Sequence, residues 1–91
     1  MVSAVEATVE VKNRLGLHLR AASVLAETVG KFSAAVDIAH GKDHVNARSV
    51  TGLIMLGAAK GTKLKVKAEG PDARAAIAAV RALFDNRFGE D

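Results

Sequence analysis

The sequence predicts an α+β domain in which helices cover one side of an open, four-stranded, largely antiparallel sheet. Some segments alternate between apolar and polar residues, as half-buried strands do, and others repeat apolar residues at helical spacing. The expected order is strand, helix, strand, strand, helix, strand, helix, with short connections. Because each expected strand has a single apolar face, three helices on the same side can cover them all.

The first third of the chain predicts a strand, a loop and a helix. Residues 5–12 alternate cleanly, with the apolar residues on one side. Residues 13–18 break that alternation, and Gly16 indicates a turn or a close approach of the backbone to another segment. Apolar residues at helical spacing then predict a helix over residues 19–29, with Gly30 in the position of a C-terminal cap.

The middle of the chain predicts a hairpin and a short helix. Residues 34–39 alternate weakly, and residues 40–43 supply turn chemistry before a second short strand. The apolar residues of segment 49–56 are too dense for one helical stripe, so this short helix should carry apolar residues on more than one face, with Gly57 as its cap. We assign Leu53, Met55 and Leu56 to the core.

The last third predicts a strand and a closing helix. Residues 63–69 alternate again, and their outward lysines would complement Glu6 and Glu10 if the first and last strands were neighbours. Pro71 is expected at the first helical position, followed by Asp72, whose charge favours the helix dipole. The outward lysines are Lys63, Lys65 and Lys67, and the expected buried stripe of the helix is Ala73, Ile77, Val80 and Phe84.

Composition limits the classes of protein that fit. A chain of 91 residues makes one domain, residues 1–91, which we expect to be a monomer. The absence of cysteine excludes disulfides and thiolate metal sites, and the absence of a signal peptide or membrane-spanning run indicates a cytoplasmic protein. The net charge of +3 would suit acidic proteins or nucleic acid, but with no Tyr or Trp and only three Phe the chain has few rings for stacking bases.

His18 is the strongest candidate for chemistry. It lies at the expected N-terminus of the first helix, where unpaired N–H groups and the helix dipole favour an anion, and Arg20 could bind the same anion. An imidazole beside such donors has what a phosphohistidine needs, although the spacing alone favours a capping or loop histidine. His40 and His44 flank the hairpin turn without the ligands that a metal site requires, so we expect no metal.

Two separated motifs give a family resemblance. Residues 13–22, Asn-Arg-Leu-Gly-Leu-His-Leu-Arg-Ala-Ala, resemble the active-site signature of the histidine-containing phosphocarrier (HPr) family of the bacterial phosphotransferase system. Residues 46–57 resemble that family's regulatory serine segment, and residues 59–62 and 68–70 resemble its last turn and strand. The resemblance covers nearly the whole chain. It implies the family's open-faced β-sandwich, in the element order expected above.

The resemblance also implies a function. His18 would accept a phosphoryl group from phosphorylated enzyme I, through Nδ1 in this family, and pass it to an acceptor domain of the EIIA type. Arg20 would stabilise the phosphoryl charge, and no metal or cofactor is needed. Where the family usually has proline after this arginine, the chain has Ala21, which restores an N–H group and loosens the start of the helix. We expect the site to survive with an altered affinity or rate.

Ser49 has two compatible interpretations. Locally it is a helix N-cap, and by resemblance it is the serine that HPr kinase/phosphorylase modifies in bacteria that have this enzyme. A phosphate there would add negative charge beside an apolar surface and weaken docking to acidic partners. The candidate docking residues, which could equally belong to the core, are Leu19, Val50, Thr51 and Ile54.

Alternatives to a phosphocarrier remain open at this point. A regulatory interaction module could act mainly through Ser49 while His18 is idle, and a small nucleic-acid-binding α/β domain would show salt-sensitive binding. An independent enzyme has the least support, because no paired carboxylates, catalytic triad or metal cluster is present in the sequence. The tail at residues 84–91 resembles the nitrogen-type paralogue, NPr, whereas residues 49–52 resemble the sugar-type HPr, so the branch stays open.

Overall fold

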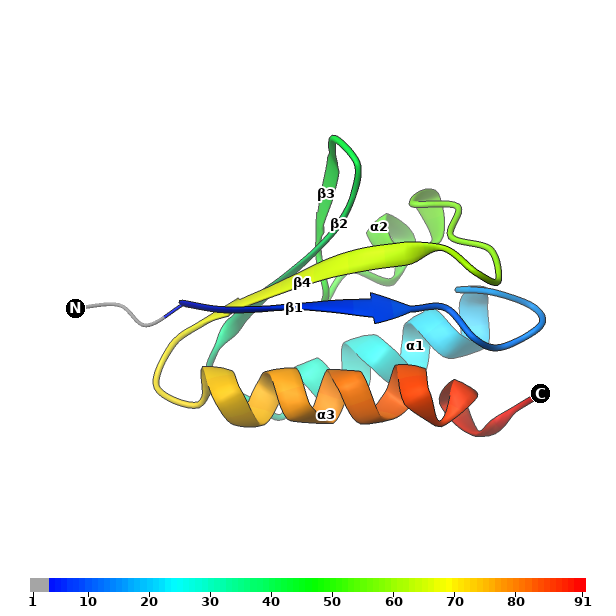
Figure 1. Ribbon diagram of the computed structural model, residues 1–91. Helices are drawn as coiled ribbons and strands as arrows, with labels where there is room; N and C mark the ends of the chain where they lie inside the picture. The colour runs from blue at the N-terminus through cyan, green and yellow to red at the C-terminus, as the bar shows by residue number, and fades with distance from the viewer. Residues whose placement is uncertain (1–3) are drawn as a thin grey trace.

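A four-stranded antiparallel sheet forms one layer of the protein. The computed structural model describes residues 4–91. Across the sheet the strand order is β1-β4-β2-β3, so β4, late in the sequence, is inserted between β1 and β2 (Figure 1). The predicted strands are confirmed, although the first ends earlier than expected. Their bounds are β1 Ala4–Glu10, β2 Ala35–His40, β3 Asp43–Asn46 and β4 Lys63–Glu69.

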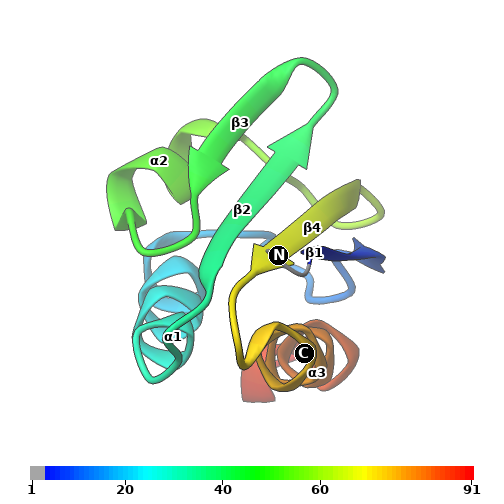
Figure 2. The same cartoon turned by 90° about the vertical axis from the view of Figure 1, so that its left-hand side faces the viewer.

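Three helices pack on the same side of this sheet. Helices α1 and α3 lie side by side beneath it, and α2 lies beyond α1 next to β3 (Figure 2). The helices are α1 Leu19–Val29, α2 Val50–Met55 and α3 Ala73–Asp85, followed by a 3-10 turn, η1 Arg87–Gly89, that the sequence did not predict. The predicted order and the open-faced arrangement are confirmed. No described helix is long and apolar enough to cross a membrane.

The core lies between the sheet and the helices. Every second residue of β2 and β4 points into it, which is the period-two pattern read from the sequence. The predicted stripe of α3 is buried throughout, and Leu25 of α1 and Leu53 of α2 are fully buried in the same core. The largest fully buried apolar side chains are Phe84, Leu25, Ile38, Leu53 and Leu64.

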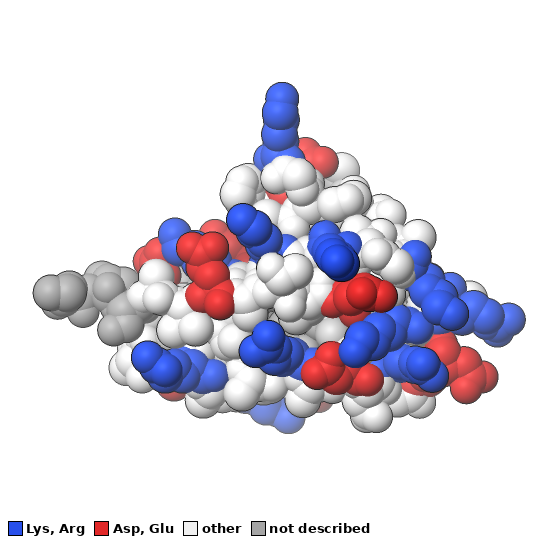
Figure 3. Space-filling model, viewed as in Figure 1, with Lys and Arg blue, Asp and Glu red and all other residues white. Residues whose placement is uncertain are grey.

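The opposite face of the sheet carries charges of both signs. Glu6 lies across from Lys67 and Glu10 across from Lys63, as expected for neighbouring first and last strands. Lys67 also pairs with Glu69 at 3.2 Å, and this hydrogen bond raises the pKa of the lysine. Basic and acidic side chains are interspersed over the face seen in Figure 3. The lysine row is therefore a balanced, solvated strand face rather than a continuous basic patch.

Two core and helix assignments were wrong. Met55 is 80% exposed, because α2 has only six residues and turns a single buried residue, Leu53, toward the core. Pro71 precedes the helix instead of beginning it, since Asp72 has non-helical backbone angles (φ −111°, ψ 26°) and α3 starts at Ala73. A short helix cannot bury two faces, and a Gly-Pro pair before a helix does not fix which residue is the first in it.

Asp72 fastens the start of α3 to the loop between α1 and β2. Its two carboxylate oxygens accept hydrogen bonds from the backbone N–H groups of Ser33 and Ala34, each at 2.8 Å. These bonds, that from Ser33 first, lower the pKa of Asp72. The backbones approach so closely here that a Cβ on Gly70 would lie 2.9 Å from Ala34 Cα. The carboxylate of Asp72 thus accepts hydrogen bonds from the α1–β2 loop and does not cap its own helix.

We expect Asp72→Ala to lower the melting temperature by a few degrees at neutral pH, because the backbone N–H groups of Ser33 and Ala34 both lose their acceptor. Since the pKa of Asp72 is lowered by folding, its contribution is present above the ordinary carboxyl range and is lost as the pH falls through the folded value. The difference from wild type, measured by thermal unfolding between pH 7 and acid, should therefore shrink on acidification. Glu27→Ala, an exposed carboxylate of α1, is the control, and an equal loss there would contradict this role.

Candidate functional site

A closely packed loop brings His18 to the beginning of α1. Gly16 has a left-handed backbone (φ +72°), and a Cβ there would lie 2.6 Å from the carbonyl oxygen of Ala58. The next residue, Leu17, is buried and donates its N–H to that same oxygen at 2.9 Å. The predicted close approach is confirmed. It fixes the loop, and with it the residue that begins the helix.

His18 is the N-cap of α1, as the sequence predicted. Its backbone is extended (φ −81°, ψ −178°), and its carbonyl oxygen accepts the first helical hydrogen bond, from Ala22 N–H, at 2.8 Å. The N–H groups that precede Ala22 have no carbonyl to bond within the helix. The side chain of His18 forms no capping hydrogen bond, so the imidazole is free for other contacts.

The imidazole contacts a carboxylate from the other end of the chain. Glu90 Oε1 lies 2.9 Å from His18 Nε2, and Oε2 lies 3.2 Å from the same nitrogen. Arg20 Nη1 donates to Glu90 Oε2 at 2.8 Å, and Asn13 Nδ2 donates to Oε1, also at 2.8 Å. The structure therefore brings the two predicted residues together, but through a glutamate that sequence reasoning missed.

Asn13 connects the loop to this carboxylate. Its side chain is fully buried, and Nδ2 also donates to the carbonyl oxygen of Gly16 at 2.6 Å. With both protons of the amide directed at acceptors, Oδ1 is the atom left buried without a partner among the described residues. The donors around Glu90, Asn13 first and then His18, lower the pKa of its carboxyl group, so it is ionised at neutral pH.

The segment after α3 is held by one aromatic anchor and a strained turn. Phe88 is buried and packs edge-on against Phe84, with ring centroids 4.9 Å apart. Arg87 and Phe88 both have positive φ, 55° and 54°, which is costly for residues with a Cβ. Arg20 Nη1 also bonds the Phe88 carbonyl oxygen at 2.9 Å. This turn reverses the chain so that Glu90 faces α1.

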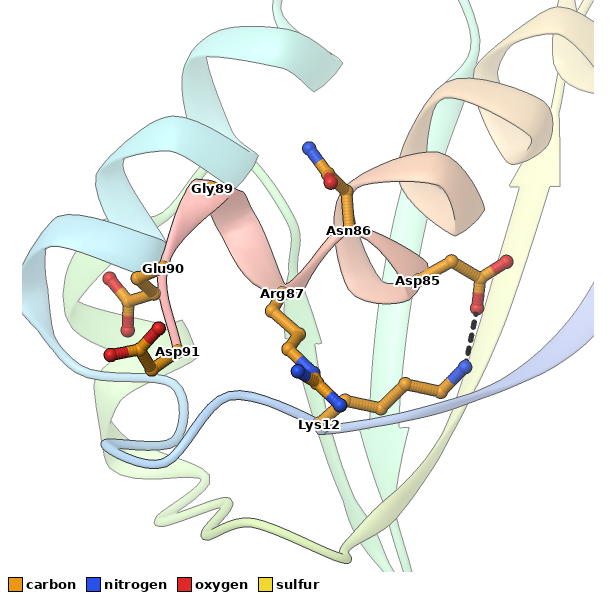
Figure 4. Close-up of a pocket in the computed structure, with 7 residues that line it drawn as sticks. All are labelled: Lys12, Asp85, Asn86, Arg87, Gly89, Glu90 and Asp91. Carbon is orange, nitrogen blue, oxygen red and sulfur yellow. Dashed lines mark hydrogen bonds and ion pairs between the residues drawn. The ribbon is translucent and has the colours of Figure 1, made fainter.

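Beside the site lies an open polar pocket. Figure 4 shows Glu90 and Asp91 on the extended stretch after η1, next to the chain that leads into α1, with Arg87 lying near Lys12. Lys12 pairs with Asp85 at 3.1 Å, and Arg14 N–H bonds the carbonyl oxygen of Asp91. The chain is thus bonded to residues 12–14 at two points, through Asp85 before Glu90 and through Asp91 after it.

The other candidate residues lie on or near α2. Ser49 is its N-cap, as predicted, and its Oγ accepts the Gly52 N–H at 3.0 Å. Of the four proposed docking residues, three are exposed (Leu19 at 64%, Ile54 at 40%, and Thr51), whereas Val50 packs partly against the core. Leu15, 63% exposed, and Met55 were not proposed and are more open to solvent than Ile54. His40 and His44 are both exposed; His40 Nδ1 is 3.5 Å from the Leu56 carbonyl oxygen.

Two residues of the site had weak or no sequence signal. Glu90 lies 72 positions from His18, beyond any helix or strand whose periodicity could place it. A sign of its anchoring was present in Phe88, an apolar residue four positions after Phe84 in an otherwise polar tail. Asn13 was read as part of the motif, but nothing in its spacing shows that it is buried.

Together, the open-faced sandwich and a histidine at a helix N-terminus define a small α+β protein whose histidine lies beside backbone N–H groups that the helix does not use. Residues 5–86 match the family model described as the PTS HPr component phosphorylation site. The chain is 43% identical over 88 residues to phosphocarrier protein NPr of Escherichia coli K12, covering 96% of this chain and 98% of that protein. It is 41% identical over 81 residues to phosphocarrier protein HPr of Xylella fastidiosa Temecula1, covering 89% and 91%.

The fold agrees with these matches. The crystal structure of HPr from Thermoanaerobacter tengcongensis superposes with a TM-score of 0.92 at 39% identity, covering 96% of this chain and 98% of that one. The chain therefore belongs to the HPr/NPr phosphocarrier family of the phosphotransferase system. The resemblance inferred from residues 13–22 and 46–57 is confirmed.

Ser49→Ala should destabilise the protein by about 1 kcal/mol, because the Gly52 N–H loses its capping acceptor. Urea unfolding measures this difference. Thr51→Ala, on an exposed position of the same short helix, is the control and should change stability by less than about 0.5 kcal/mol. Equal effects of the two substitutions would show that the hydroxyl of Ser49 does not cap α2.

Arg87→Gly should stabilise the protein by up to about 1 kcal/mol, because glycine adopts positive φ without the Cβ penalty. Urea midpoints compared with wild type test this expectation. Arg81→Gly, in the interior of α3, should have the opposite sign and cost about 1 kcal/mol. Destabilisation by both substitutions would mean that the turn at Arg87 is not strained.

Proposed function

We propose that this protein carries a phosphoryl group on His18, taken from phosphorylated enzyme I and passed to an acceptor of the EIIA type. The observation that carries the proposal is the position of His18 at the N-cap of α1, where the N–H groups before Ala22 are unused by the helix. Family membership supports it, since the matched family model is a phosphorylation-site model.

The chemistry requires alignment rather than a bound cofactor. A ring nitrogen of His18 donates its lone pair to phosphorus, and the bond from phosphorus to the donor breaks with its electron pair left on the donor. The negative phosphoryl oxygens then lie near the positive end of the α1 dipole and its free N–H groups. Such preorganised donors stabilise the transferred charge without reorganising.

Arg20, which is hydrogen-bonded to Glu90, would also stabilise the negative charge of the phosphoryl group. Nη1 is already committed to Glu90 and Phe88, whereas the side chain remains 54% exposed and its other N–H groups can turn to a phosphoryl oxygen. Ala21, which stands where the family usually has proline, is fully buried. We expect transfer to proceed, with a rate set partly by the extra N–H.

Partner proteins would dock on the apolar residues around His18. Leu19 follows the histidine directly, and Thr51 and Ile54 present a second exposed surface on α2, which contacts α1. Exposed apolar side chains grouped near a charged site are typical of protein-binding surfaces. In this proposal Met55 and Leu15 extend the docking surface that Leu19, Val50, Thr51 and Ile54 define.

Regulation through Ser49 is the second part of the proposal. The residue is exposed, and its hydroxyl lies at the start of α2, beside that docking surface. A phosphate there is compatible with the helix N-terminus, yet it places almost two negative charges beside apolar residues that partners must cover. Phosphorylation by a kinase of the HPr kinase/phosphorylase type would therefore weaken docking without altering His18.

Incubation with phosphoenolpyruvate and a bacterial enzyme I should add one phosphoryl group to the wild-type protein. The group should be lost in mild acid, as a phosphoramidate is, and it should be absent from His18→Ala. Intact-protein mass spectrometry measures both results. The histidine is the nucleophile, so its removal should abolish the added mass rather than slow its appearance.

His44→Ala is the matched control, because this histidine is exposed on β3 and makes no side-chain hydrogen bond among the described residues. It should be phosphorylated like wild type. Ser49→Ala should also be phosphorylated, since Ser49 has no part in the transfer. Absence of added mass from wild type with both sugar-type and nitrogen-type enzyme I would reject the carrier function and favour the regulatory module.

A further inference from the structure

Glu90 contacts one specific atom of the imidazole. Both of its oxygens lie within 3.2 Å of His18 Nε2, while Arg20 and Asn13 hold the carboxylate from other directions. The side chain of Glu90 is only 20% exposed, so the contact is enclosed rather than a loose surface pair. This carboxylate therefore covers Nε2 and leaves the other ring nitrogen unblocked by it.

The protonation of the pair follows from the chemistry of the two groups. An ionised carboxylate can only accept hydrogen bonds, and the donors around Glu90 keep it ionised at neutral pH. The hydrogen bond at 2.9 Å therefore requires the proton to be on Nε2. In a neutral imidazole the remaining lone pair is then on Nδ1.

We propose that Glu90 is a positioning residue which holds His18 in the Nε2–H form and directs phosphorylation to Nδ1. The biological meaning of this inference rests on the proposed function, but the choice of ring nitrogen can be tested on His18 without any partner protein. Glu90 does not touch the phosphoryl group. It acts through His18, by fixing which nitrogen is nucleophilic and by occupying the approach to the nitrogen that is not.

The transfer balances with the ring in this form. Nδ1 gives its lone pair to phosphorus, the donor's bond to phosphorus breaks, and the donor keeps that electron pair. His18 retains its proton on Nε2, so the ring gains one unit of positive charge. The carboxylate of Glu90, already in contact with Nε2, is placed to stabilise that charge in the product and on the way to it.

The charged groups facing the ring are few. Glu90 and Arg20 meet on its Nε2 side, with the uncharged Asn13. His18 also borders a shallow depression lined by Leu15, Leu17, Gly57, Ala58 and Ala59, with no charged side chain among these described residues. A phosphoryl donor that approaches through this depression passes no charged side chain among the residues that line it.

Phosphoramidate, a small-molecule donor that phosphorylates histidine without any protein, tests the proposal directly. Its P–N bond breaks as the new one forms, and ammonia leaves. Wild type should give one product, Nδ1-phosphohistidine, identified by its ³¹P and ¹⁵N signals. Glu90→Ala should give both isomers, because Nε2 is uncovered and the ring is free to exchange its proton. Glu90→Gln should keep the Nδ1 product, since its amide oxygen can still accept from Nε2–H.

Two further readouts separate positioning from stability. Ring ¹⁵N shifts should show the Nε2–H form in wild type and an average of both forms in Glu90→Ala. Transfer from phosphorylated enzyme I should slow about tenfold to a hundredfold in Glu90→Ala, in kcat more than in KM. Asp91→Asn, the adjacent exposed carboxylate, is the control and should match wild type in all three measurements.

A single Nδ1 product from Glu90→Ala, or a mixture of isomers from wild type, would overturn the proposal. An unchanged ring spectrum in Glu90→Ala would do so as well. Failure of enzyme I to phosphorylate wild type, combined with the expected phosphoramidate isomers, would reject the phosphocarrier function while the positioning role of Glu90 stands. The two proposals therefore fail by different results.

Discussion

One carboxylate connects the three parts of the site. Glu90 accepts hydrogen bonds from Asn13 in the loop after β1, from His18 at the start of α1, and from Arg20 in its first turn. Without it, the buried amide of Asn13 and the guanidinium of Arg20 would each lose an acceptor, and the imidazole would lose its fixed orientation. A partly buried polar network of this kind is most stable when its members are satisfied together.

The rest of the fold supplies a rigid frame for that network. Leu17 and Ala58 tie the loop to the segment before β4, and Asp72 ties the loop between α1 and β2 to the start of α3. Because α3 packs against β1 and runs beneath the sheet, it delivers the chain back to the N-terminal end of α1 (Figure 1). The open sheet face takes no part in this frame and carries charged side chains of both signs on neighbouring strands.

Periodicity predicted most of the frame because each element follows from local spacing. The bounds of α1 and β4 and the buried stripe of α3 are those of the prediction, since a single buried face repeats regularly in each. The errors arise where local spacing does not determine burial or long-range contacts. Met55 belongs to a helix too short to bury two faces, and Glu90 reaches His18 through a turn with positive φ, which no propensity or periodicity indicates.

The position of Glu90 also bears on how the protein can be handled. Asp91 follows it immediately, and its carbonyl oxygen is bonded to Arg14, so any peptide joined after Asp91 would begin beside the imidazole and have to leave through this crowded corner. Ala4, where β1 begins, pairs with Glu69 at the opposite end of the sheet. Affinity tags, fluorophores and surface linkers are therefore best attached ahead of β1, where they leave the histidine and its carboxylate undisturbed.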